Sequence, residues 1–263
     1  MRTLPFDYAV RNLGRSTTRL LLSVGGSALV VLLLLAASAF VRGMQRSLQA
    51  TGEPDNVILV GAGSEESIER SEVDSGVAGL VAASIPGIRT RGGAVYLSPE
   101  VQLQLLLKAR GDQFPARIVP ARGITPAAWL VHSSVQISDG RPPVPAADEI
   151  IVGAMVGVKM GVPESELQIG KSIIIDKRPF KIVGRFRAPG TVTEAEVWLP
   201  ATDLKQVTKR TTDSCVIVTL DQTISEFADV AAFVKSRPDL ELAATRETAY
   251  YARLSSFFAP IQV

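Results

Sequence analysis

The chain offers few residues that could form a catalytic centre. His132 is its single histidine, and Ser133, Ser134 and Asp139 follow it closely. A Ser/His/Asp triad is recognised by its arrangement in space, and neighbours in sequence rarely supply one. We therefore interpret His132 as a surface or capping histidine. No second histidine is present to complete a zinc site, and the carboxylates are scattered. We predict no catalytic residue, no metal site and no cofactor.

The single cysteine, Cys215, lies in the apolar run Cys215-Val216-Ile217-Val218. It is either a small core residue of a strand or a reactive thiol. A reactive thiol needs a partner that lowers its pKa, and no histidine lies near it in sequence. We favour the core interpretation. One cysteine cannot form an intramolecular disulfide.

Two glycine-containing stretches only partly resemble phosphate-binding motifs. Gly61-Ala62-Gly63 follows an apolar run like the start of a dinucleotide fingerprint, but Glu66 stands where the third glycine is required. Gly170-Lys171-Ser172 resembles the end of a P-loop, but Ser165 replaces its first glycine and a predicted strand follows. We predict a strand followed by a turn in the first case, and no ATPase within this chain.

Composition limits the class of protein. The 263 residues are enough for one or two folded units. The 28 basic and 26 acidic residues leave a net charge of only +2, whereas a nucleic-acid-binding protein needs a strong basic stripe. We predict that nucleic acid is not a partner.

An uncharged stretch of residues 20–41 begins at Leu20 and ends at Val41. As a helix it is about 33 Å long, close to the ~30 Å hydrocarbon core of a bilayer. A buried core helix rarely runs this long without a polar face. A signal peptide has a shorter apolar core of about 7–15 residues, although Ala37-Ser38-Ala39 resembles a cleavage site. We predict an uncleaved transmembrane helix, with the lipid bilayer as a partner.

The residues that flank this stretch predict its orientation. Four arginines precede it and two follow it, at positions 2, 11, 15, 19, 42 and 46. Basic residues stay on the cytoplasmic side, so we predict a cytoplasmic N-terminus and a periplasmic or extracellular main domain. Residues 1–19 form a leader in which Phe6, Ala9, Val10 and Leu13 recur at helical spacing. We expect a helix at the membrane interface rather than a disordered tail.

The remaining chain predicts an α+β protein, in which the transmembrane helix is followed by a mixed α/β domain over residues 42–246. Strand patterns dominate residues 125–200, and we expect a β-rich subdomain inserted there. We predict two strands within residues 95–109, separated near Ser98-Pro99, and a hairpin around Lys177-Arg178-Pro179. Residues 247–263 start a helix whose aromatic side chains, such as Tyr250 and Phe257, are typical of an approach to a second span.

Three groups of residues resemble permeases of the MacB/LolC/FtsX type of ABC transporter. These are the leader Asp7-Tyr8-Ala9-Val10-Arg11-Asn12-Leu13-Gly14-Arg15, the strand Asp55-Asn56-Val57-Ile58-Leu59, and a longer series, Gly140-Arg141, Glu149-Ile150-Ile151-Val152-Gly153, Ile169-Gly170-Lys171-Ser172-Ile173, Phe180-Lys181-Ile182-Val183-Gly184 and Glu196-Val197-Trp198-Leu199-Pro200. Their order along one chain resembles that of the family over nearly the whole sequence.

The resemblance implies a permease subunit in the bacterial inner membrane, with a periplasmic core domain of the MacB type. It implies a cytoplasmic ATP-binding subunit as partner, pairing of two permeases, and room for a periplasmic adaptor. Family members export drugs or peptides, move lipoproteins or regulate cell-wall hydrolases. Phe6, Tyr8, Arg11 and Arg15 of the leader are then candidates for the cytoplasmic interface. The family's later spans are missing from this sequence, so we expect a fragment of a longer permease.

Two other functions belong to different classes. The chain could be a single-pass anchored binding or adaptor domain without energy coupling. An anchored hydrolase is disfavoured because the catalytic residues are absent. The length of the reading frame separates the first of these from a permease, since further apolar spans after Val263 would support the permease.

Overall fold

The computed structural model describes residues 17–111 and 113–256. The chain forms two compact units, which are separated near residue 45. The larger unit covers residues 46–256. The smaller unit contains most of helix α2 (Thr17–Gln49). Among the described residues, α2 is the one helix that is long and apolar enough to cross a membrane. It contains the predicted stretch from Leu20 to Val41 and confirms that this stretch is a helix.

Strands form most of the larger unit. The strands of the main sheet are β1 (Asn56–Gly61), β4 (Leu97–Ala109), β5 (Arg117–Ile124), β6 (Gln136–Gly140), β7 (Glu149–Gly153), β8 (Ser172–Ile175), β9 (Arg178–Arg187), β10 (Val197–Pro200), β11 (Cys215–Thr219) and β12 (Leu242–Arg246). A separate ribbon pairs β2 (Thr90–Arg91) with β3 (Ala94–Val95).

Short helices connect these strands. The α-helices are α3 (Val77–Ser84), α4 (Ala128–Val131), α5 (Val156–Met160), α6 (Ala201–Thr208), α7 (Phe227–Ser236) and α8 (Glu247–Ser256). The 3₁₀ helices are η1 (Ile68–Arg70), η2 (Glu164–Leu167), η3 (Val192–Ala195) and η4 (Pro238–Leu240). Together, the helices and strands confirm a mixed α/β domain with a β-rich core.

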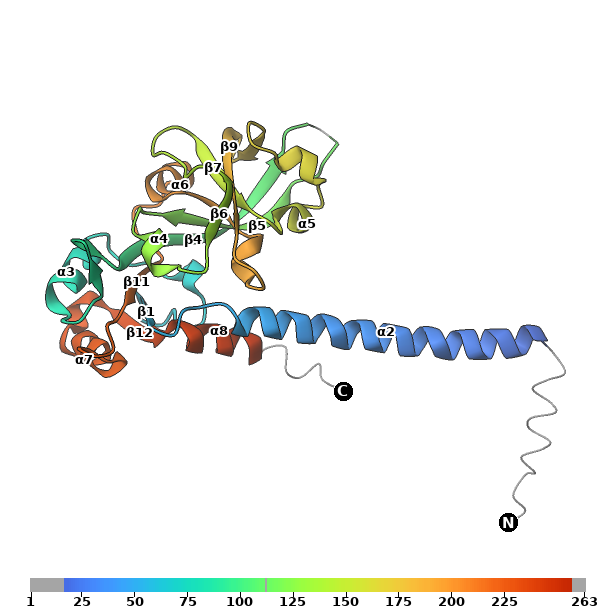
Figure 1. The fold of residues 1–263 in the computed structure, drawn as a ribbon, viewed down its shortest axis with the longest axis horizontal. Coiled ribbons are helices and arrows are strands. Elements are labelled where there is room, and N and C mark those ends of the chain that lie inside the picture. The colour runs from blue at the N-terminus through green and yellow to red at the C-terminus, as the bar shows by residue number, and fades with distance from the viewer. Residues whose placement is uncertain (1–16, 112, 257–263) are drawn as a thin grey trace, which may run out of the picture. The chain divides into compact units, whose positions relative to one another are not determined.

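The main sheet has an open part and a closed part. Its strand order is β12-β1-β11-β4-β5-β10-β7-β9-β6, and β8 pairs with both β4 and β9. The path β4-β5-β10-β7-β9-β8 therefore returns to β4 and closes a ring of strands. Figure 1 labels β4, β5, β7 and β9 of this ring. Strands β12, β1 and β11 extend from β4 as an open antiparallel sheet. The ring contains β4 and β5, which precede the stretch 125–200 where we expected the β-rich insertion.

Strand β4 belongs to both parts. Its first residues pair with β11, as in the pair Pro99 with Val216, and its later residues, from Val101 onward, pair with β5. The sequence predicted a break at Ser98-Pro99, and this prediction is wrong. Proline lacks a donor and is tolerated where a strand has a partner on only one side. The strand changes partner near residue 100 and continues without a break.

Each part has its own hydrophobic core. The ring encloses alternating side chains, among them Val101, Ile150, Phe180 and Leu199. The open sheet packs β1 and β11 against α3 and α7 through a second cluster that includes Val81 and Val230. A third cluster surrounds Trp198, which points away from the ring interior because neighbouring residues of β10 alternate in direction.

Local sequence explains most boundaries. The hairpin β8–β9 turns at Asp176 and Lys177, whose φ values of 45° and 68° fit a two-residue turn. Helix α7 begins at Phe227 because Glu226 and Asp229 form a capping box. Helix α3 begins at Val77, after Val73 has paired with Asp213 in an isolated bridge.

Candidate functional site

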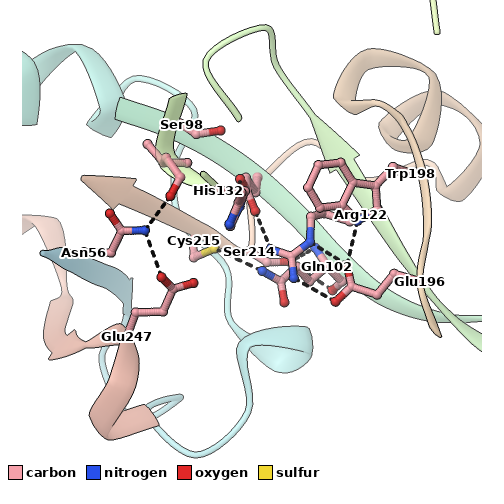
Figure 2. A network of polar contacts seen from close by, with 12 residues as sticks. Asn56, Ser98, Gln102, Arg122, His132, Glu196, Trp198, Ser214, Cys215 and Glu247 are labelled. Carbon is pink, nitrogen blue, oxygen red and sulfur yellow. Dashed lines mark hydrogen bonds and ion pairs between the residues drawn. The ribbon is translucent and has the colours of Figure 1, made fainter. Parts of the chain in front are cut away.

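A buried network of charged side chains lies where β4 passes from the open sheet to the ring (Figure 2). We call Glu100, Arg122, His132 and Glu196 the buried charge network. They come from β4, from β5, from the C-terminal end of α4 and from the residue before β10, respectively. All four are buried, and Arg122 is only 1% exposed. The network thus joins four different segments of the chain, between Glu100 and Glu196.

Arg122 is at its centre. Its Nη1 donates to Glu100 Oε2 at 2.7 Å. Its Nε and Nη2 donate to the two oxygens of Glu196 at 2.7 and 2.8 Å, which makes that pair bidentate. His132 Nε2 lies 2.7 Å from the other oxygen of Glu100. The guanidinium also lies 5.5 Å from the ring of Trp198, whose Nε1 donates to Glu196.

Strand register produces this geometry. Arg122 pairs across β5 and β4 with Gln102, two residues after Glu100 and therefore on the same face. On its other side Arg122 is level with Trp198 of β10, which runs parallel to β5. The side chains of these neighbours project to one side of the ring, outside its apolar interior. The pleat therefore collects the charges on one face.

The charges stabilise one another. Burial raises the pKa of Glu100, but His132 and Arg122 outweigh it and hold that pKa at about 2. Burial lowers the pKa of His132, and the Glu100 carboxylate more than reverses this and raises it above 6.5. Burial also opposes the charge of Arg122, yet Glu196 and Glu100 raise its pKa. Glu100 therefore favours its ionised form beside Arg122 and His132, and buried charges are tolerated when they are paired in this way.

A second set of hydrogen bonds connects the network's surroundings to the first residue of α8. Glu247 Oε2 accepts from Asn56 Nδ2 at 2.8 Å and from the backbone N–H of Glu53 at 2.9 Å. Asn56 Nδ2 also donates to the carbonyl of Val131, and its Oδ1 accepts from Thr219 at 2.6 Å. Burial raises the pKa of Glu247 in spite of these donors. We call Glu53, Asn56 and Glu247 the Glu247 junction.

The arrangement does not activate a nucleophile. Ser214 exchanges hydrogen bonds with the backbone of Gln102, since its hydroxyl donates to that carbonyl and accepts from that N–H. Burial raises the pKa of the Cys215 thiol, which favours the unreactive protonated form. Within residues 17–111 and 113–256, every buried side-chain nitrogen and oxygen has a hydrogen-bond partner. A fully satisfied network of this kind rigidifies the region around it.

The structure corrects one residue that sequence singled out and confirms others. His132 is not a surface histidine, since it is 7% exposed and paired with Glu100, but it does occupy the C-cap of α4, as the capping alternative predicted. Cys215 is a buried residue of β11, as predicted. Gly61 ends β1 before a turn, and Ser172 begins β8. Both agree with the structures that we predicted in place of phosphate-binding motifs. The predicted cytoplasmic interface, Phe6, Tyr8, Arg11 and Arg15, lies outside the described residues.

Sequence reasoning missed Glu100, Arg122 and Glu196. The available signal was a charge beside apolar residues in the sequence: Arg122 follows Val119-Pro120-Ala121, and Glu196 opens the apolar run Val197-Trp198-Leu199. A charged residue inside an apolar strand pattern is rarely buried unless it is paired. Such a signal indicates that a partner exists, but not which residue it is.

Comparisons with known proteins agree with this fold. The family model described as the MacB-like periplasmic core domain matches residues 20–236. The periplasmic region of MacB from Actinobacillus actinomycetemcomitans has a similar structure, with a TM-score of 0.56 and 11% identity over 80% of this chain and 97% of that one. Comparison with curated proteins gave no significant sequence match.

Two further solved structures are similar. The extracellular domain of the noncanonic ABC-type transporter YknZ from Gram-positive bacteria has a TM-score of 0.51 and 14% identity, covering 72% of this chain and 99% of that one. A domain of a putative permease from Porphyromonas gingivalis has a TM-score of 0.50 and 15% identity, covering 73% and 90%. The chain belongs to the family of MacB-like periplasmic core domains, a component of ABC transporter permeases.

Proposed function

We propose that this chain is part of the membrane subunit of an ABC transporter and transmits movement between the membrane and a periplasmic domain. The family match and the apolar helix α2 support this assignment. The excess of arginines before the uncharged stretch of residues 20–41 supports a cytoplasmic N-terminus in the bacterial inner membrane. Helix α8 would lead towards a second span, so that two membrane segments would hold the domain.

The observation that carries the proposal is the Glu247 junction. Glu53 follows α2 in the chain, and Glu247 is the first residue of α8. One oxygen, Glu247 Oε2, accepts from the backbone of Glu53 and from Asn56 on β1. The two segments that would connect the domain to the membrane are therefore tied together at one carboxylate. A displacement of either segment acts directly on the other.

The junction has continuous contacts with the rest of the domain. Asn56 is bonded to Thr219 of β11 and to the carbonyl of Val131, next to His132 of the buried charge network. Thr51 Oγ1 accepts from the backbone of Val192 at 2.9 Å, in the helix η3 that precedes Glu196. Rigid, fully bonded contacts of this kind can transmit a movement between two arrangements of a domain. The network would act as a rigid connection between the open sheet and the ring.

In this proposal the energy comes from a partner. A cytoplasmic ATP-binding subunit would contact the leader through Phe6, Tyr8, Arg11 and Arg15, two permeases would pair, and a periplasmic adaptor could join them. Nucleotide binding can shift the permease between two states only if the partner contacts them differently. The output would be export, lipoprotein release or signalling to the cell envelope.

Co-purification tests the partner. The gene is expressed in its host as it is encoded, and the tagged protein is isolated from membranes with any ATP-binding subunit. We expect an ATP-binding subunit to co-purify, and the double variant Arg11→Glu/Arg15→Glu to lose it. Lys235→Glu/Arg187→Glu, the matched double reversal at exposed residues of α7 and β9, should keep it. The proposal would be refuted if no ATP-binding subunit co-purified and if the isolated protein had no effect on the ATPase rate of such a subunit.

Hydrogen exchange tests the coupling. In the isolated complex we expect ATP to change amide exchange in peptides covering residues 51–61 and 242–256. Glu247→Ala should abolish this change without releasing the ATP-binding subunit, because it removes the carboxylate that joins the two segments. Glu66→Ala, which removes an exposed carboxylate, is the control and should behave like the wild type. An unchanged response in Glu247→Ala would rule out the junction as the connection.

A further inference from the structure

A groove lies outside the buried charge network, between β4, the β8–β9 turn and the end of α6. Its volume is about 610 Å³, within the range of roughly 300–1,000 Å³ that is common for small-molecule sites. The lining residues are Leu105, Leu106, Lys108, Ala116, Ile174, Ile175, Asp176, Lys177, Val207, Thr208 and Lys209. We call it the lysine-rimmed groove.

The lining is largely apolar. Leu105, Leu106, Ile174 and Val207 contribute to it. Leu106 is 61% exposed, because alternate residues of β4 face outward while Leu107 is buried inside the ring. A leucine side chain this exposed does not gain the free energy of burial, and a ligand that covers it supplies that gain. The groove therefore suits an apolar chain.

The rim is mainly cationic. Lys108, Lys177 and Lys209 line the groove together with one carboxylate, that of Asp176. In the part of the chain that the structure describes, neither Lys177 nor Lys209 forms an ion pair with a carboxylate of this domain. These two ammonium groups are available to an external anion. Charge complementarity thus favours an anionic ligand over a cationic one.

Both of these lysines occupy unusual backbone positions. Lys177 in the β8–β9 turn has φ of 68°, and Lys209 at the C-terminal cap of α6 has φ of 56°. Glycine adopts this left-handed conformation more easily than any other residue. Residues held in such conformations cluster at functional sites. Because both positions on this rim suit glycine, replacing either lysine by glycine removes its charge without straining the backbone.

We propose that the lysine-rimmed groove binds a single acyl chain that carries an anionic head group. The apolar lining takes the chain, and Lys177 and Lys209 contact the anion. The chemistry is that of an anionic monoacyl lipid, for which dodecyl phosphate is a simple probe. An acidic segment of a protein would match the lysines, but it would leave the apolar lining uncovered.

The experiment uses the full chain in phosphatidylcholine nanodiscs. A fatty acid bearing a photoreactive diazirine is cross-linked below its micelle concentration, and labelled peptides are identified by mass spectrometry. We expect labelling of peptides from β4 and β8, with labelling of α2 as the internal measure of membrane partition. Dodecyl phosphate should suppress the β4 label at a concentration about tenfold lower than dodecylphosphocholine does, since only its head group is a net anion. Inorganic phosphate should not suppress it.

Variants separate charge from backbone effects. Lys177→Gly and Lys209→Gly should each weaken competition by dodecyl phosphate about threefold, as expected for loss of one exposed charge contact. Neither should lower the melting temperature, because glycine suits both positions. Asp176→Gly relaxes a similar backbone conformation in the same turn, φ of 45°, but removes the opposing charge, so binding should strengthen or stay the same.

Leu106→Glu provides the test of the apolar lining and should reduce labelling about tenfold or more. Ile118→Glu is its control: Ile118 is the cross-strand partner of Leu106, is also 61% exposed, and does not line the groove. The proposal is overturned if β4 and β8 are not labelled, or if Leu106→Glu and Ile118→Glu reduce labelling equally. It is also overturned if Asp176→Gly weakens binding as the lysine variants do. Competition by phosphate alone, or by an acidic peptide and not by dodecyl phosphate, overturns it as well.

Discussion

Replacement of Glu100 tests the buried charge network most directly. The carboxylate is fully buried, and Arg122 and His132 hold its pKa at about 2 in the folded protein, against 4.5 for the free group. At 1.36 kcal/mol per pH unit, this difference corresponds to roughly 3 kcal/mol of stability for the ionised form. We therefore expect Glu100→Gln, which is nearly isosteric, to lower the free energy of unfolding by about 3 kcal/mol at pH 7.

The pH dependence gives this prediction a sign. A carboxylate whose folded-state pKa is lowered stabilises the fold above its unfolded pKa, and this stability is lost as the pH falls towards the folded value. For Glu100 the window runs from pH 4.5 down to about 2. The wild type should lose its advantage over Glu100→Gln progressively within this window, and the two proteins should converge.

The assay is unfolding in guanidinium of the full chain in detergent, followed by fluorescence. Both tryptophans of the chain are at the network, with the rings of Trp129 and Trp198 5.5 Å apart. Asp239→Asn is the control, because Asp239 pairs with Arg237 on the surface, where the two side chains are 59% and 36% exposed, and such surface pairs contribute less than about 1 kcal/mol. A loss below about 1 kcal/mol in Glu100→Gln, or an equal loss at pH 7 and pH 3, would contradict the reasoning.

Three further predictions follow from single residues. The pKa of His132 is raised in the folded protein. Its charge therefore stabilises the fold below pH 6.5, and this contribution is lost as the pH rises through the folded-state pKa. In the same unfolding assay, the advantage of the wild type over His132→Gln should shrink above pH 6.5. Gly140→Ala should lower the free energy of unfolding by more than about 2 kcal/mol. Gly140 has φ of 76°, and the added Cβ would lie 2.2 Å from the carbonyl oxygen of Val183. Gly190→Ala, with φ of 79° and open space, should lose only about 1 kcal/mol. Phe180→Ala should lower the free energy of unfolding, measured by thermal unfolding, by about 3–5 kcal/mol, since it leaves a cavity in the core of the ring.

The elements were largely predictable because they depend on local patterns. The apolar stretch in α2 and the β8–β9 hairpin follow from charge and from period-two alternation within short windows. Strand β4 was predicted as two strands because Pro99 breaks a ladder only if both sides of the strand are paired. That information concerns neighbours from elsewhere in the chain, and it is not contained in the window around Pro99.

The buried charge network was not predictable for the same reason. Arg122 and Glu196 are 74 residues apart, and Glu100 and His132 are 32 apart. Each carboxylate by itself is typical of an exposed residue, and burial becomes favourable only when its partner is in place. The closure of the ring by β8, which decides which faces are interior, depends likewise on pairing between distant strands.

The order of the strands also determines when the domain can fold during its synthesis. Strand β1 has no partner near it in sequence: it pairs with β11 and β12, and its Asn56 bonds to Thr219 at a separation of 163 residues. Ribosomes add about 5–20 residues per second, so β1 would emerge with both edges unpaired for roughly 8–30 s. Exposed strand edges invite association with other chains. We expect the nascent chain to need a chaperone, or another means of keeping β1 apart from other strands, until residues 215–246 have been made.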